Sequence, residues 1–135
     1  MQRTVTSFDT GKHHIHLELT ITDFKGLKHS VSGILDTGAS KTEFSDLFLI
    51  HTGFIQSAGE AKIRPGLQTQ KYGKISLPSM IICGHEIHDM EIFVSHFETS
   101  WGIDALIGLD FFRRFLVTID YLSGNLIVEP YNTGK

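Results

Sequence analysis

The sequence predicts a single, mostly β domain, and three observations support this fold class. Isoleucine, valine, threonine and phenylalanine recur in short runs that glycines interrupt, which is typical of strands joined by turns. Residues 14–21 alternate strictly between polar and apolar side chains, as expected for a half-buried strand. With 135 residues, the chain is long enough to bury a core, so we expect residues 1–135 to form one domain.

The first predicted elements are two strands joined by a turn. The apolar residues from Ile15 to Ile21 occupy every second position and share one face of the first strand. Residues 24–27, which include Gly26, are expected to turn the chain into a second strand at about residues 28–35.

A short helix is expected next, followed by a long polar segment. Ser45 and Asp46 carry side-chain oxygens that suit a helix N-cap, and they precede an apolar stretch at residues 47–51. Gly53 is suited to end this helix. Residues 58–77 lack a wide apolar face and contain Pro-Gly near their centre, so they predict a long exposed hairpin.

The C-terminal half continues with strands and one more helix. Two strand candidates, residues 80–83 and 86–94, flank Gly84. Asp110, within the stretch ALIGLDFF, is expected to cap a helix that runs to about Phe115.

Three phenylalanines in this helix, at positions 111, 112 and 115, have helical spacing and are expected to be core or dimer contacts. The neighbouring Arg113 and Arg114 are expected to be solvated. Residues 116–130 then contain two strand runs, separated by the turn residues Ser123, Gly124 and Asn125.

The stretch ILDTGAS, residues 34–40, is the candidate active site. Its carboxylate, Asp36, follows two apolar residues, where burial and hydrogen bonds can tune a carboxyl pKa for acid–base catalysis. Gly38 lets a backbone N–H approach this carboxylate closely, and Thr37 and Ser40 add hydroxyl groups. Two such carboxylates face to face can share one proton, so that one activates water while the other polarises a carbonyl group.

This stretch resembles the active-site motif of the aspartic peptidases, in which an apolar pair precedes Asp, Thr or Ser, and Gly. Further downstream, residues 105–111, ALIGLDF, are similar to the second signature of that family, where Gly108 follows two apolar residues. The continuation RRFLVTIDYLSGNLIVEP is also typical of cellular and bacterial retroviral-protease-like domains. The resemblance covers about residues 13–131 and implies a retropepsin-like acid protease fold, a single lobe with a flap hairpin and a short C-terminal helix.

The motif Asp-Thr-Gly occurs once in this chain, and Asp-Ser-Gly does not occur, whereas two-lobed pepsin-like members carry the motif twice. A single-lobe chain can complete a carboxylate pair only as a homodimer that brings Asp36 from each copy to a two-fold axis. The resemblance therefore implies an aspartic endopeptidase that acts on a peptide or protein substrate, with no metal and no cofactor.

The resemblance also implies a role for each motif residue. Asp36 would hold the attacking water together with its counterpart in the second copy. Thr37 would lock the two loops together across the dimer axis, and Gly38 would contact the bound peptide backbone. Ser40 would hydrogen-bond the catalytic carboxylate and favour its charged form and activity at acidic pH. Additional support for the site is expected from Ala39 and Gly108.

The flap that would cover the substrate is expected within the polar hairpin. Its tip is predicted at Arg64, Pro65, Gly66 and Leu67. Flaps of the retroviral type contain more glycine at the tip, and a proline stiffens the backbone there. The flap of this chain is therefore expected to close over the substrate differently from flaps of the retroviral type.

The candidate site has two other interpretations. Asp36 could belong to a simple strand-end turn, with an Asx-type bond and Gly38 at a positive φ. The fold could also serve as a catalytically weak or inactive module for dimerisation or peptide binding. The intact ILDTGAS motif favours the enzyme over this module.

A zinc site is a more distant alternative. Cys83, His85 and His88 lie close together in the sequence, and residues 13–16 contain three further histidines. Zinc requires three or four such ligands in a tetrahedral array, but His85 and His88 fall on opposite faces of the predicted strand. We therefore expect no metal site.

Composition excludes other classes of function. The net charge is −3 and the 12 Lys and Arg residues are scattered, which opposes nucleic-acid binding. No apolar run approaches the roughly 18–20 residues that span a bilayer, so no membrane contact is expected within this chain. A single cysteine, Cys83, excludes an internal disulfide and favours a reducing intracellular compartment. A soluble domain of a longer, membrane-anchored protein is also compatible with these features.

Overall fold

The computed structural model of the chain describes residues 2–55 and 71–131. Strands dominate these residues, and the helices are short. The elements are β1 (Thr4–Ser7), β2 (His16–Thr22), β3 (Lys28–Leu35), β4 (Glu43–Ser45), α1 (Asp46–His51), β5 (Lys71–Ile82), β6 (His85–Ser95), the 3₁₀ helix η2 (Thr99–Trp101), β7 (Ala105–Ile107), α2 (Leu109–Phe112), β8 (Leu116–Asp120) and β9 (Asn125–Glu129).

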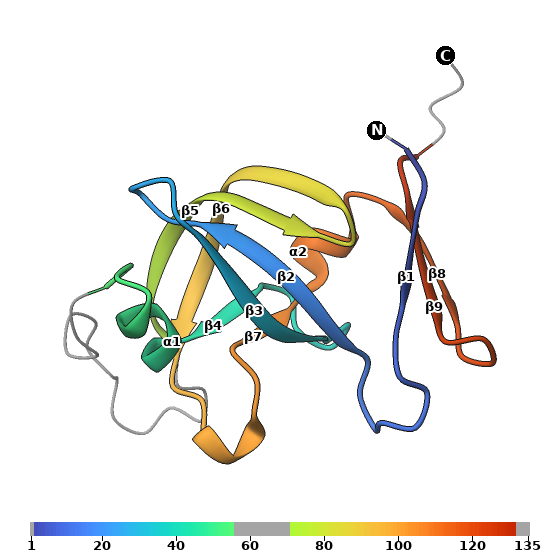
Figure 1. Cartoon of the computed structure of the whole chain (residues 1–135), viewed down its shortest axis with the longest axis horizontal. Coiled ribbons are helices and arrows are strands. Elements are labelled where there is room, and N and C mark those ends of the chain that lie inside the picture. The colour runs from blue at the N-terminus through green and yellow to red at the C-terminus, as the bar shows by residue number, and fades with distance from the viewer. Residues whose placement is uncertain (1, 56–70, 132–135) are drawn as a thin grey trace.

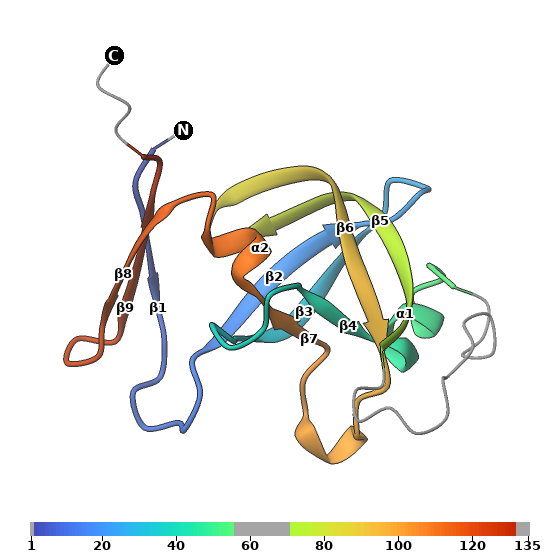
Figure 2. The same cartoon turned by 180° about the vertical axis from the view of Figure 1, so that it is seen from behind.

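Among the described residues, six strands close into a barrel in the order β2-β3-β7-β4-β6-β5, and three strands form a separate sheet in the order β1-β9-β8. We call the second of these the terminal sheet. Figures 1 and 2 show the terminal sheet at one end of the molecule, with α2 between it and the barrel and α1 toward the opposite end. The predicted mostly β fold class is confirmed.

The hairpin of β2 and β3 follows the sequence pattern closely. The alternating apolar side chains from Ile15 to Ile21 are buried in the barrel core, together with Val31 on β3. The two strands pair antiparallel with His16 opposite Ile34. The predicted turn is present between the strands, and Gly26 adopts a positive φ of 84° that suits a residue without a Cβ.

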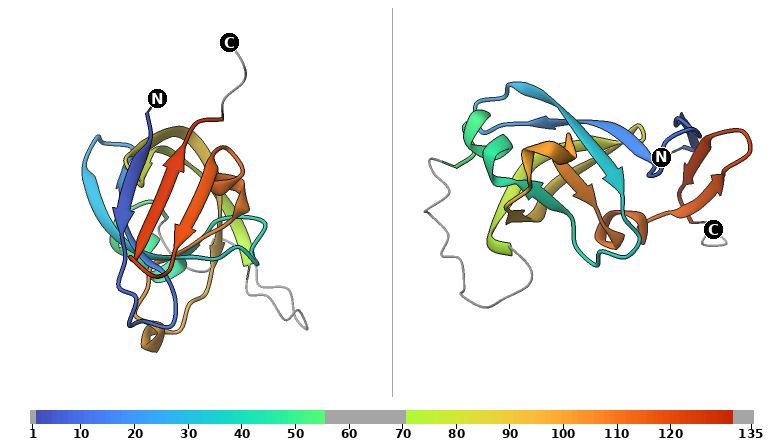
Figure 3. Two further views of the ribbon diagram at one scale, coloured as in Figure 1. Left: turned by 90° about the vertical axis from the view of Figure 1, so that its right-hand side faces the viewer. Right: turned by 90° about the horizontal axis from the view of Figure 1, so that it is seen from below.

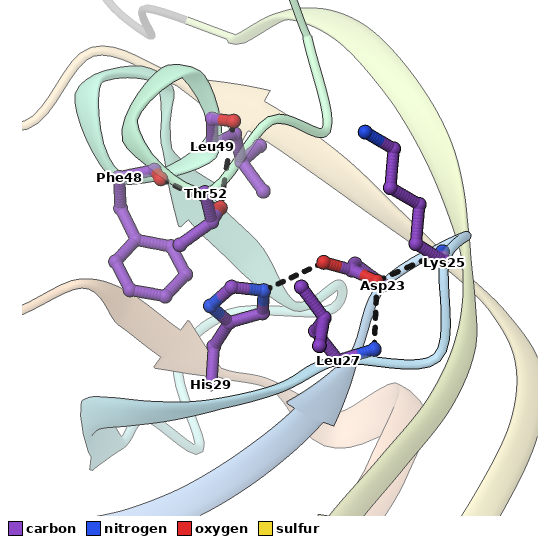
Figure 4. Close-up of polar contacts among 7 residues, drawn as sticks. All are labelled: Asp23, Lys25, Leu27, His29, Phe48, Leu49 and Thr52. Carbon is purple, nitrogen blue, oxygen red and sulfur yellow. Dashed lines mark hydrogen bonds and ion pairs between the residues drawn. The ribbon is translucent and has the colours of Figure 1, made fainter.

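The carboxylate of Asp23 organises this turn (Figure 4). It accepts hydrogen bonds from the backbone N–H groups of Lys25 at 2.8 Å and Leu27 at 2.9 Å. The Nε2 atom of His29 on β3 lies 2.9 Å from its other oxygen. These contacts lower the pKa of Asp23, with the His29 bond as the largest cause. The turn is therefore fixed by a side chain that the sequence pattern did not single out.

The predicted helix after the candidate site is confirmed as α1. The Ser45 hydroxyl accepts from the Phe48 N–H at 3.4 Å and caps its N-terminus. At the other end, the Thr52 hydroxyl donates to the carbonyl oxygen of Phe48 at 2.8 Å, as Figure 4 shows. Gly53 follows with a φ of 85° and ends the helical course.

The prediction of an exposed hairpin over residues 58–77 is wrong for residues 71–77. These residues belong to β5, which pairs antiparallel with β6 along almost its whole length. Ile75 packs against the core and Leu77 is fully buried, because β6 covers the apolar positions of this alternating segment. The predicted strands at residues 80–83 and 86–94 are confirmed as parts of β5 and β6.

The helix expected from Asp110 to about Phe115 is shorter and is capped differently. Helix α2 spans Leu109–Phe112, its N-cap is Gly108, and a turn continues to Phe115. Asp110 lies inside the first turn, where its carboxylate binds another segment of the chain. The three phenylalanines are buried as core residues, and Arg113 and Arg114 are exposed as predicted.

The terminal sheet contains β1, a strand that the sequence pattern did not reveal. It pairs antiparallel with β9, with Thr4 opposite Val128. The Thr4 hydroxyl donates to the Cys83 carbonyl oxygen at 2.6 Å, which joins the sheet to the turn between β5 and β6. Figure 3 shows that the three strands stand beside the barrel rather than within it. The two strand runs predicted over residues 116–130 are confirmed as β8 and β9.

Candidate active site

Two neighbouring parallel strands of the barrel wall, β3 and β7, position the candidate catalytic carboxylate. Ile34 on β3 pairs with Leu106 on β7, and Leu35 pairs with Ile107. Immediately after β3, the Asp36 N–H donates to the Ile107 carbonyl oxygen at 2.9 Å. The backbone of Asp36 is therefore tied to the strand that the second sequence motif supplies.

The motif loop itself is a tight turn with a half-buried carboxylate. The Gly38 N–H donates to Asp36 Oδ1 at 3.0 Å, and the Ala39 N–H donates to the Asp36 carbonyl oxygen at 3.1 Å. The first of these is the Asx-type bond that a simple turn would form. However, Gly38 does not adopt the positive φ that the simple-turn interpretation required. The loop therefore fixes the Asp36 carboxylate and leaves part of it open to solvent.

Gly108 is the point where α2 meets the motif loop. A Cβ atom at this position would lie 2.7 Å from the Lys41 backbone and 2.8 Å from the Ala39 carbonyl oxygen. The next residue, Leu109, donates its N–H to that same oxygen at 2.9 Å. The two sequence motifs are thus in direct backbone contact, and only glycine leaves room for the contact.

Thr42 holds the far end of the loop, and the sequence pattern gave no reason to single it out. Its side chain is fully buried. The Thr42 hydroxyl donates to Asp110 Oδ1 at 2.6 Å and accepts from the Gly108 N–H at 3.1 Å. The Thr42 N–H donates to Asp110 Oδ2 at 2.9 Å. The only sequence signal was its place close behind the motif, two residues beyond Ser40.

The other predicted site residues are placed as follows. Thr37 is exposed at the tip of the loop, which leaves its hydroxyl accessible to a second molecule. Ser40 is also exposed and forms no hydrogen bond with Asp36 within residues 2–55 and 71–131, so its support of the carboxylate stays a prediction. The predicted flap tip at Arg64, Pro65, Gly66 and Leu67 lies outside the described residues.

The histidine and cysteine residues considered as metal ligands are dispersed. His85 is buried, with Nε2 3.2 Å from the Thr4 hydroxyl and its ring packed on Phe115. His88 is exposed, and its Nε2 lies 3.9 Å from Glu86. Among the residues that the structure describes, no three His, Cys, Asp or Glu side chains are grouped closely enough to hold a metal ion.

No helix in the described part of the chain is long and apolar enough to cross a membrane.

Comparison with known proteins identifies the fold. No protein-family model matches the chain, and no curated protein matches its sequence significantly. Among solved structures, it is similar to a retropepsin-like aspartic protease from Rickettsia conorii, with a TM-score of 0.67 at 19% identity over 95% of this chain and 90% of the other.

It is also similar to the retroviral protease-like domain of Ddi1 from Leishmania major, with a TM-score of 0.58 at 18% identity. That match covers 88% of this chain and 94% of the other. Both matches agree with the fold that the resemblance of the two sequence motifs implied. The chain therefore has a retropepsin-like aspartic protease fold.

Proposed function

We propose that the chain is an aspartic endopeptidase, active as a homodimer in which each copy supplies one Asp36. The observation that carries this proposal is the half-buried Asp36 carboxylate at the end of a barrel strand, in a chain with the retropepsin-like fold. The Gly38 N–H donates a hydrogen bond to one oxygen of the Asp36 carboxylate. The other oxygen can therefore bind water or share a proton with a second carboxylate.

The chemistry requires two carboxylates in different protonation states. The ionised one accepts a proton from water while the water oxygen attacks the carbonyl carbon of the substrate. The protonated one donates its proton to the carbonyl oxygen, and the C–N bond breaks once the amide nitrogen has been protonated. Because each chain contains the motif once, the second carboxylate has to come from a second copy.

The remaining motif residues have supporting roles in this proposal. Thr37, exposed at the loop tip, faces its counterpart across the dimer axis. Gly38 leaves space for an extended peptide backbone beside the carboxylates, and Gly108 keeps α2 against the loop. Neither a metal nor a cofactor takes part in these steps.

The decisive experiment compares the native chain with the Asp36→Asn variant on a mixed peptide library between pH 4 and 7. The substitution is nearly isosteric and removes the acid–base group, so cleavage is expected to fall by at least about a hundredfold. Asp89→Asn is a matched control, because Asp89 is exposed on β6 and its φ of 55° suits asparagine. Cleavage that survives Asp36→Asn would refute the assignment. If neither the native chain nor the Asp36→Asn variant cleaves any peptide, a peptide-binding or dimerisation module is favoured instead.

A further inference from the structure

A small cavity lies between the start of α1 and the segment that connects β6 to β7, residues 96–104, which we call the η2 loop. Figures 1 and 2 show this loop projecting from the barrel next to α1. The Ser45 N–H donates to the Asp104 carbonyl oxygen at 2.8 Å, and the Asp104 N–H donates to the Ser32 carbonyl oxygen at 2.6 Å. The end of the η2 loop is therefore fixed to both β4 and β3, which gives the cavity defined walls.

The cavity is separate from the candidate active site. No residue of the segments 34–42 and 105–112 is among the described residues that line it. Its volume is about 180 Å³. This volume is below the range of about 300–1,000 Å³ that is typical of small-molecule sites. A cavity of this size therefore suits a single side chain, and a ligand in it leaves Asp36 accessible.

Aromatic rings form the apolar part of the cavity. Phe48 on α1 lines it and packs against Phe44, with ring centroids 6.2 Å apart. Phe97 on the η2 loop also lines it, is only 3% exposed, and packs against Trp101 with ring centroids 5.5 Å apart. Ile103 adds an aliphatic side chain. Because neighbouring rings hold both phenylalanines in place, the cavity offers fixed apolar surface to the stem of a long side chain.

The charged residues that line the cavity are both acidic, Glu98 and Asp104. Asp104 Oδ2 accepts from the Ser32 N–H at 3.0 Å, which fixes this carboxylate and leaves Oδ1 able to accept from a ligand. The one basic side chain of the η2 loop is His96, whose Nδ1 lies 3.3 Å from Asp46 Oδ2, and it does not line the cavity. Two carboxylates beside one small apolar space favour a ligand that combines an aliphatic stem with a positive charge.

We propose that this cavity binds the arginine side chain of a partner protein. A guanidinium group is planar and weakly hydrated, it stacks on aromatic faces, and its five N–H donors suit two carboxylates. The ammonium group of lysine is compact and strongly hydrated, so it gains less from the rings of Phe48 and Phe97. The proposal concerns a site outside the Asp36 loop and does not depend on the proposed peptidase function.

Three short peptides test this assignment on the native chain. Each has the form acetyl-Gly-X-Gly-amide, where X is arginine, citrulline or lysine; citrulline has nearly the shape of arginine but carries no charge. Binding is followed by ¹H–¹⁵N NMR. The arginine peptide is expected to give saturable shifts at residues 45–48 and 97–104, and none at residues 36–42. The citrulline and lysine peptides are expected to bind at least about threefold more weakly.

A second measurement repeats the titrations with the Glu98→Gln and Glu91→Gln variants. Glu98 is exposed, so its substitution leaves the fold intact. Glu91 is a matched control, because it is also exposed, lies on β6 with Lys74 3.8 Å away, and does not line the cavity. Glu98→Gln is expected to weaken binding of the arginine peptide about two- to fivefold and to leave that of the citrulline peptide unchanged. Glu91→Gln is expected to change neither.

Several outcomes would overturn the proposal. Equal affinity for the arginine and citrulline peptides would show that charge is not recognised, and equal affinity for arginine and lysine would show that the guanidinium group is not. Shifts that fall outside α1 and the η2 loop, or no saturable shift with the arginine peptide, would remove the site. Equal effects of Glu98→Gln and Glu91→Gln would exclude Glu98 as the recognising carboxylate. None of these measurements requires peptide cleavage, so their results stand apart from the test of Asp36.

Discussion

The hydroxyl of Thr42 donates to the carboxylate of Asp110 at 2.6 Å, across 68 positions of the sequence. This bond joins the end of the Asp36 loop to the first turn of α2. The start of the loop is held by the bond from Asp36 to Ile107. The candidate catalytic carboxylate is therefore positioned from both sides by the segment of residues 105–112, which contains the second sequence motif.

Replacing Thr42 by valine is expected to destabilise the fold by about 1–3 kcal/mol. Valine keeps the shape of threonine but leaves the Gly108 N–H unpaired and removes one donor from Asp110. Urea denaturation measures the change in unfolding free energy. Thr42→Ser restores the hydroxyl and should recover most of the loss. Because valine keeps the packing, a Thr42→Val variant as stable as the native chain would contradict the contribution of the hydroxyl group.

Gly108→Ala is expected to cost about 1–3 kcal/mol of stability and to reduce peptide cleavage, because the new methyl group meets the Lys41 backbone at 2.7 Å. The φ of Gly108 is −97°, so the cost arises from contact and not from backbone strain. Gly11→Ala is a suitable control, since its nearest neighbour is the Asp9 side-chain oxygen at 3.2 Å. Equal melting temperatures for the two variants would contradict the tight contact.

The turn at Asp23 predicts a pH-dependent contribution to stability. Hydrogen bonds from His29, Leu27 and Lys25 lower the pKa of Asp23 in the folded state. Its contribution is therefore fully present above the unfolded pKa of about 3.9 and is lost as the pH falls through the lower folded value. Asp23→Asn should be less stable than the native chain at pH 5–7, and the difference should shrink below about pH 4.

Urea midpoints measured at several pH values test this expectation. Glu98→Gln is the control, because Glu98 is exposed and makes no side-chain cap bond. A stability difference for Asp23→Asn that stays constant down to pH 2.5 would contradict the role of the ionised carboxylate.

Mixing native and Asp36→Asn chains tests whether the catalytic site is shared. At equal amounts and fixed total concentration, only about a quarter of randomly formed dimers contain two native chains. Activity should therefore fall to about a quarter of the value for native protein alone, after time for exchange of subunits. A fall to one half would mean that each chain acts independently, and the homodimeric site would be wrong.

Local patterns in the sequence predicted much of the fold. The alternation from Ile15 to Ile21 and the Ser45 cap are set by neighbouring residues, and both are present as expected. Strand β1 was missed because its four residues, TVTS, form a strand by pairing with β9 at the other end of the chain, and not through a local pattern. The cap predicted at Asp110 failed for a similar reason, since its carboxylate binds Thr42 instead.

The candidate site was predicted in part. A motif of seven residues was sufficient to indicate Asp36 and Gly38, whose contact is local. The contact between Gly108 and Lys41, and the bonds from Thr42 to Asp110, depend on how distant segments are placed in the barrel. No periodicity in the sequence reports such placement, so these features emerged only from the three-dimensional arrangement.

The pairing of β1 with β9 has a consequence for the order in which parts of the fold can form during synthesis. Thr4 and Val128 are 124 positions apart, so bringing them together closes a loop that includes nearly the whole chain. A growing polypeptide has made every barrel strand and the complete Asp36 loop before residues 125–129 leave the ribosome. Until then β1 lacks its partner strand β9. Translation thus completes the terminal sheet last, and a truncated product that already carries its carboxylate motif lacks this part of the fold.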